Sequence, residues 1–102
     1  MQTIKQTVSS IILAQLGGRG RVQAMTGAKQ FMSGNGSLAF RIGNNPEGVT
    51  NIEIILRAND TYDVIATAVR GFKVKDKGVL TGVYSDRLKS AVTSLTGLEL
   101  TL

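Results

Sequence analysis

The chain has 102 residues, with 12 Lys and Arg against 7 Asp and Glu, and it contains neither His nor Cys. Their absence excludes an imidazole base, a thiol nucleophile, a disulfide and a zinc site of the usual nitrogen and sulfur kind. With 42% hydrophobic and 19% charged residues, the composition is that of one globular domain over residues 1–102 and not of a disordered chain. We therefore expect a protein that binds a partner, and we predict neither an enzyme nor a bound cofactor.

The positive charge is concentrated in the N-terminal half. Residues 1–46 carry five basic residues and no acidic one, whereas the seven basic and seven acidic residues of 47–102 cancel. Such an asymmetry indicates either ordinary solubility charge or a surface that faces an anion: nucleic acid, an anionic membrane or an acidic protein. No apolar run is long enough to span a bilayer, and no segment resembles a signal peptide. We therefore expect a cytoplasmic protein without a membrane partner.

The first segment has helical periodicity. Its apolar residues recur every three to five positions and are Ile4, Val8, Ile11, Ile12 and Leu16. This stripe predicts a helix that Thr3 caps and that Gly17 and Gly18 end. We expect a short strand over residues 21–25, followed by an irregular connection over 26–36 that ends in a turn.

The middle of the chain has the alternation of strands. Residues 37–42 and 50–58 each place apolar side chains on one face and mostly polar ones on the other. A turn at Asn59-Asp60 joins the second of them to a strand over 61–74, which predicts an antiparallel hairpin. In the strand over 61–74 both faces carry apolar residues, so the sequence does not determine which face is buried.

The last third predicts a turn, a short strand and a helix. Asp76-Lys77-Gly78 is a turn signal, and a short strand over 79–83 follows it. A helix is expected over 86–96, with Ser85 as its cap and Gly97 at its exit. The expected buried stripe of this helix is Tyr84, Leu88, Ala91, Val92 and Leu95. The final residues alternate as a terminal strand or a docked tail would.

These elements sum to an α+β fold. We predict a two-layer sandwich, in which an antiparallel sheet of four to five strands carries the N-terminal and C-terminal helices on one face. The order of the short strands is not determined by these patterns.

Catalytic arrangements are scarce. Asp60 and Asp63 are close in sequence, but a turn accounts for Asp60, and no third acid is nearby to complete a Mg²⁺ site. Ser85 and Lys89 have the spacing of a Ser-Lys dyad, but a helix cap and a solvated Lys explain them better. We predict no catalytic residue and no metal site.

Basic residues are the strongest candidates for function. Arg19 and Arg21 stand between glycines, Arg41 and Arg57 point away from the core by alternation, and further cations precede the turn at 76–78. We predict that nucleic acid or an acidic partner is bound by Arg19, Arg21, Lys29, Arg41, Arg57, Lys73 and Lys75. The chain has only two Tyr, three Phe and no Trp, several of which the core needs, so stacking on bases is not expected.

Several segments resemble small proteins encoded in bacteriophage and prophage genomes. They are residues 24–31, 37–41, 59–64, 69–71, 82–88 and 96–98. The resemblance implies an origin in mobile DNA and a place in the cytosol of a host bacterium. It implies no particular activity and no site.

Together these observations predict a non-enzymatic accessory protein of phage type that binds nucleic acid through a basic surface. The alternative is a phage-encoded, anti-CRISPR-like inhibitor of a host defence nucleic-acid machine, which acts by protein–protein binding. A third interpretation is a virion or assembly component that associates with itself through an exposed strand edge. The expected partner is thus nucleic acid or a host nucleoprotein complex, and the oligomeric state stays open.

Overall fold

The computed structural model describes residues 8–34 and 36–98. The strands in this part are β1 (Lys29–Gly34), β2 (Ser37–Arg41), β3 (Asn51–Leu56), β4 (Tyr62–Arg70) and β5 (Lys73–Val83). The helices are α1 (Val8–Gln15), α2 (Arg19–Thr26) and α3 (Leu88–Thr96), and a 3₁₀ turn, η1 (Ser85–Arg87), leads into α3.

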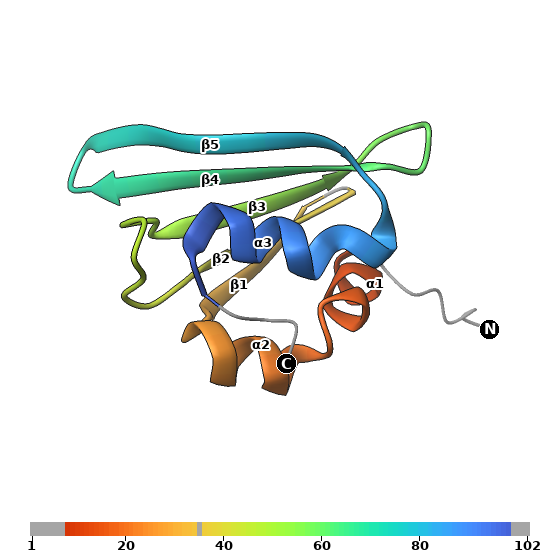
Figure 1. Ribbon diagram of the computed structural model, residues 1–102, viewed down its shortest axis with the longest axis horizontal. Coiled ribbons are helices and arrows are strands. Elements are labelled where there is room, and N and C mark those ends of the chain that lie inside the picture. Colours follow the sequence, from red (N-terminus) through yellow and green to blue (C-terminus); the bar gives the residue numbers. More distant parts are fainter. Residues whose placement is uncertain (1–7, 35, 99–102) are drawn as a thin grey trace.

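The strands form a single antiparallel sheet. Each strand pairs with the next one along the chain, so the sheet order is β1-β2-β3-β4-β5. The helices lie against one face of this sheet and leave the other face uncovered in the described part of the chain (Figure 1). The predicted α+β architecture with helices on one face is confirmed.

The core lies between the helices and the sheet. The helix-facing side chains of the central strands are almost fully buried: Leu38, Phe40, Ile52, Ile54, Val64 and Ala66. Ile12 of α1, Val22 of α2 and Val92 of α3 pack into the same cluster. The buried face expected over 37–42 is confirmed, and the one expected over 50–58 is confirmed as far as Leu56. β3 ends there because the chain turns at Arg57, whose carbonyl oxygen accepts from the Asp60 N–H at 3.0 Å, so Ala58 is exposed and not part of the buried face. In β4 the structure shows which face is buried. Within the described residues, no helix combines the length and apolar character needed to cross a membrane.

Residues 21–25, expected to be a strand, belong to helix α2. The buried residues of α2 are Val22 and Thr26, which are four positions apart, and the Thr26 hydroxyl donates to the Val22 carbonyl oxygen at 2.6 Å. Gly27 ends the helix with a φ of 69°. The strand prediction was wrong because two alternating apolar residues, Val22 and Ala24, are too few to distinguish a strand period from a helix period.

Residues 26–36, expected to be an irregular connection, contain the edge strand β1. Its side chains are exposed except for the half-buried Phe31, so its sequence lacks the alternation that marks a half-buried strand. The pairing with β2 shifts between Lys29 and Met32, and Gln30 has a φ of 56° there. This irregularity further disguises the strand in the sequence.

The second hairpin turns earlier than the sequence predicts. Arg70 pairs directly with Lys73, so Gly71 and Phe72 form a two-residue turn, and Gly71 has the positive φ (61°) that such a turn requires. The turn expected at 76–78 was wrong. The strand pairing shifts there, and Gly78 lies so close to α3 that a Cβ would be 2.7 Å from Leu95 Cδ2. Glycine at 78 therefore marks a close approach of strand and helix, not a chain reversal.

The C-terminal helix starts later than expected. No side-chain cap hydrogen bond is present at η1 or α3, so Ser85 does not cap the helix, and Tyr84 is 66% exposed and not part of the buried stripe. Leu88 and Val92 are buried as expected, and Gly97 ends α3 with a φ of 77°. The expected start of the first helix, before Val8, and most of the expected tail, 99–102, lie outside the described residues.

Candidate nucleic-acid interface

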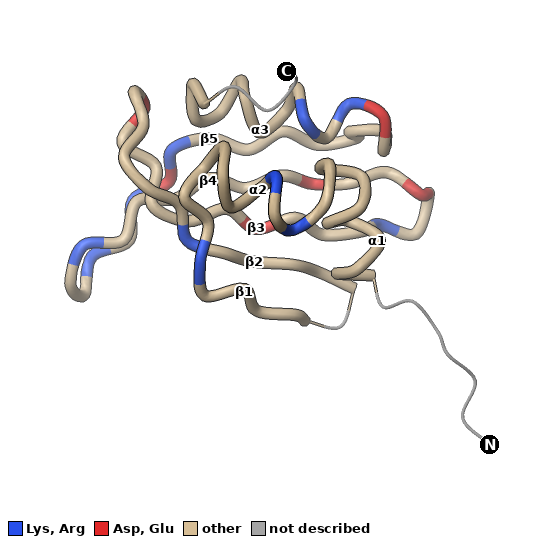
Figure 2. Tube along the Cα trace, turned by 90° about the horizontal axis from the view of Figure 1, so that it is seen from below, with Lys and Arg blue, Asp and Glu red and all other residues tan. Residues whose placement is uncertain are grey.

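One end of the sheet collects half of the Lys and Arg residues (Figure 2). In an antiparallel meander, neighbouring strands run in opposite directions, so the first residues of one strand lie at the same end of the sheet as the last residues of its neighbour. Lys29 of β1 is thus the register partner of Arg41 of β2, and Arg70 of β4 is the partner of Lys73 of β5. We call this region the basic end. Its cations are Lys29, Arg41, Arg70, Lys73, Lys75 and Lys77, and all of them are exposed.

The basic end extends across the whole sheet. The register partners that start with Lys29 and Arg41 continue through Asn51 and Thr67 to Asp76, which stands between two lysines of β5. Five strands at a spacing of about 4.8 Å make this row roughly 19 Å wide. The row begins with two cations, continues with two uncharged polar side chains and ends at Asp76, which Lys75 and Lys77 flank along β5. Positive charge therefore lies on β1 and β2 at one side of the sheet and on β5 at the other.

Arg41 and Arg70 line the same hollow. It has a volume of about 380 Å³, and the loop between β2 and β3 forms its wall. The Asn45 side chain holds this loop: its Nδ2 donates to the carbonyl oxygens of Gly43 (2.9 Å) and Val49 (2.6 Å), and its Oδ1 accepts from the Val49 N–H at 3.0 Å. A fixed loop with two guanidinium groups beside it suits a phosphate, because each guanidinium presents several N–H donors in a planar fork.

The cations of the basic end have no carboxylate partner in the described part of the chain. The ion pair found there joins Arg57 to Asp63, with Arg57 Nη2 at 2.5 Å and Nε at 2.7 Å from Asp63 Oδ2. Arg57 follows β3 at the opposite end of the sheet, so the structure separates it from the other predicted contacts. Its guanidinium is already paired with a carboxylate, and it lies outside the basic end.

Arg19 and Arg21 lie in the first turn of helix α2 and not in a flexible glycine loop. The Arg19 guanidinium carbon is 4.6 Å from the centre of the Phe31 ring. The Phe31 and Phe40 rings pack together with their centroids 5.4 Å apart and their planes tilted by 37°. The Arg21 side chain lies over Gly17, and its Nε is buried without a hydrogen-bond partner among the described residues. Arg19 therefore covers apolar surface, and both arginines belong to the helical layer and not to the strand ends that form the basic end.

Phe72 is a surface aromatic, although we expected the core to need several of the five aromatic residues. Its exposed fraction is 107%, at the tip of the β4–β5 hairpin between Arg70 and Lys73. By contrast, Phe40 and Tyr62 are buried. The signal in the sequence is the glycine before Phe72, since a two-residue turn after an alternating strand places both turn residues in solvent.

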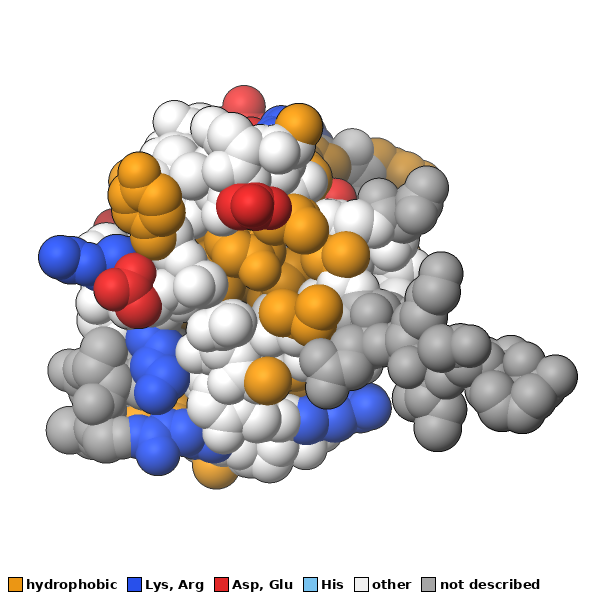
Figure 3. Space-filling view, turned by 90° about the vertical axis from the view of Figure 1, so that its right-hand side faces the viewer, with side chains coloured by type: hydrophobic (Ala, Val, Ile, Leu, Met, Phe, Trp, Pro, Cys, Tyr) orange, Lys and Arg blue, Asp and Glu red, His pale blue; other side chains and the backbone are white. Residues whose placement is uncertain are grey.

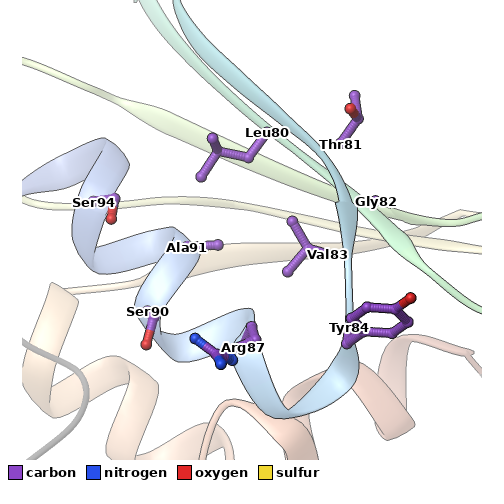
Figure 4. Close-up of a pocket in the computed structure, with 9 residues that line it drawn as sticks. All are labelled: Leu80, Thr81, Gly82, Val83, Tyr84, Arg87, Ser90, Ala91 and Ser94. Carbon is purple, nitrogen blue, oxygen red and sulfur yellow. The ribbon is translucent and has the colours of Figure 1, made fainter.

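A second surface is a groove of about 410 Å³ between β5 and α3. Figure 4 shows Leu80 and Val83 of β5 pointing toward Ala91 of α3, with Arg87 at one end. β5 is the last strand of the sheet, so its outer edge has no strand neighbour in the described part of the chain. The end of the molecule opposite the basic end, seen in Figure 3, has hydrophobic side chains around a central hollow and charges of both signs around them.

The acidic residues of the described chain form no cluster that could hold a metal ion. Asp63 is engaged by Arg57, and no group of three or more acidic side chains comes together as a metal site within residues 8–34 and 36–98. No protein family, curated protein or solved structure matches the chain. The functional assignment therefore depends on the geometry of its own surfaces.

Proposed function

We propose that this protein binds nucleic acid through the basic end and acts as an accessory protein without enzymatic activity. The observation that carries the proposal is the convergence of six exposed cations from four strands on one end of the sheet. Phosphate contacts of this kind supply most of the affinity of proteins that bind nucleic acid without reading sequence.

Within the basic end we assign different tasks to arginines and lysines. Arg41 and Arg70 share the hollow beside the β2–β3 loop, and they hold one phosphate through bidentate hydrogen bonds. The flanking lysines of β1 and β5 act as mobile point charges on neighbouring phosphates. Six such contacts predict that the logarithm of affinity falls with the logarithm of salt concentration with a slope of roughly −4 for a single strand and −5 for a duplex.

The test is fluorescence anisotropy with labelled DNA and RNA oligonucleotides over a series of salt concentrations. The double variant R41A/R70A removes both guanidinium groups from the hollow and is expected to make the salt slope shallower by about two. The control, R87A/K89A, removes the same charge near the start of α3 and is expected to keep the wild-type slope. If the wild type fails to bind DNA and RNA at low salt, the proposal is wrong.

The groove beside β5 supports one second candidate function, the protein-binding inhibitor of a host defence machine. An unpaired strand edge next to a groove accepts an extended segment of another protein as an additional strand. Arg87 at the end of the groove favours a segment that carries a carboxylate.

This second candidate is tested by affinity capture from a bacterial lysate after nuclease treatment. Ser94 is exposed on the groove side of α3, so S94R fills the groove without changing the core. A host protein that the wild type retains and S94R loses supports the inhibitor. Retention that does not depend on Ser94, or no retained protein, contradicts it.

A further inference from the structure

The exposed aromatic side chain of Phe72 has no structural task. The two-residue turn needs a positive φ at Gly71, which glycine supplies, and places no demand on the side chain that follows. With an exposed fraction of 107%, the Phe72 ring contributes no buried apolar area to the fold. A phenyl ring in this position therefore exposes apolar surface to water with no stability gained in return.

The surroundings of Phe72 are cationic. Arg70 and Lys73 face each other directly across the strand pair that ends in the turn, and Lys75 pairs with Ala68 two register positions further from the turn. Val74 next to them is also exposed, at 65%. The hairpin tip thus combines a flat apolar ring with positive charge on both of its strands.

We propose that Phe72 stacks on an unpaired base and that the ligand of the basic end is single-stranded nucleic acid. This inference rests on the proposed function, since it assigns the base to Phe72 and the flanking phosphates to Arg70 and Lys73. Every base has a π-face, so an aromatic ring beside a cationic track binds single strands with little sequence preference. The sequence-level expectation against stacking assumed that the core needs the aromatic residues, and Phe72 lies outside it.

A duplex is disfavoured as the ligand because its bases already stack on one another. Inserting a ring costs a few kcal/mol for each base step that is opened, and proteins offset that cost by wrapping the bent duplex over a large surface. The row of register partners across the basic end is only about 19 Å wide, which is too little surface for such wrapping. Phe72 is also the only aromatic residue within the two strands and turn of the β4–β5 hairpin apart from Tyr62, which is buried. An unpaired base, by contrast, is available to the ring without opening a duplex.

The chain has no Trp, so F72W introduces a unique fluorescent reporter at the hairpin tip. We expect a thymidine oligonucleotide to quench the emission of F72W, because stacking brings the base against the indole. An oligomer with the same phosphates but no bases is expected to leave the emission unquenched. The control Y84W carries its indole at another exposed aromatic position, outside the basic end, and is expected to keep its emission with both oligomers.

Affinity measurements complete the test. F72A is expected to bind the thymidine oligonucleotide about 5- to 150-fold more weakly than the wild type, the range that corresponds to the loss of one stacked base. F72Y is expected to retain wild-type affinity, and the base-free oligomer is expected to bind wild type and F72A equally.

The outcomes separate the two proposals. If the wild type binds neither oligomer at low salt, the proposed function fails, and the stacking inference fails with it. If the wild type binds both oligomers equally and F72A matches it, the proposed function stands and the stacking inference is wrong. Stronger binding to a duplex than to a single strand overturns the inference. So does an indole emission of the F72W variant that responds to vesicles of phosphatidylserine and not to the oligonucleotide.

Discussion

At the scale of single residues, neighbours decide what each charged or aromatic side chain is free to do. Strand alternation predicts that Arg41 and Arg57 both point away from the core. In the structure, Arg57 forms an ion pair with Asp63, whereas Arg41 lines a hollow. The sequence predicted that each would point outward. It did not predict the pairing of Arg57, because the partner depends on the register of β3 against β4.

Tyr62 yields a prediction for the dependence of stability on pH. Burial, and to a smaller extent the charge of Asp60, raise the pKa of Tyr62 above its usual value of 10.0. Above pH 10 the phenol therefore ionises in the unfolded state but stays protonated in the folded state. The stabilisation is complete below pH 10 and is lost as the pH rises toward the higher folded pKa, so the free energy of unfolding falls over that interval.

Urea unfolding at a series of pH values between about 9 and 11 measures this effect. Y62F removes the ionisable group and is expected to lose less stability over this interval than the wild type does. Y84F, at an exposed position, is expected to follow the wild type. Equal pH dependence of Y62F and the wild type would contradict the assignment.

At the scale of elements, long amphipathic segments were predictable and short or exposed ones were not. β3, β4 and α3 each bury several side chains on one face, so their periodicity is visible in the sequence. α2 buries only Val22 and Thr26, and β1 buries no side chain fully. For these two elements, tertiary packing decided the secondary structure, because local preference is weak where little surface is buried.

Ala24, exposed on α2, allows a test of that assignment. In a helix, A24G is expected to lower the free energy of unfolding by about 1 kcal/mol and A24V by about 0.5 kcal/mol, because Ala has the highest helix propensity. In a strand, Val at this position would instead raise stability. Urea unfolding of the two variants measures both changes, and a more stable A24V would contradict the helix.

At the scale of the whole molecule, the cations that cluster at one end of the sheet come from both halves of the chain. The acid-free N-terminal half supplied the expectation of a basic surface, but the basic end takes only Lys29 and Arg41 from it and the other four cations from β4 and β5. The asymmetry along the chain predicted a basic surface centred on the N-terminal half, whereas four of the six clustered cations come from the C-terminal half. An antiparallel meander has this effect because alternate strand ends meet at one edge of the sheet.

Composition and periodicity alone determined the α+β class, the β3–β4 hairpin and the buried faces of the long strands, since each of these follows from residue types and their local spacing. Only the tertiary structure decided that Arg41 and Arg70 share a hollow, that Arg57 pairs with Asp63, and that Phe72 is exposed at a cationic tip. These features depend on strand register, turn position and helix placement. Such properties arise from contacts between distant segments, and no local pattern encodes them.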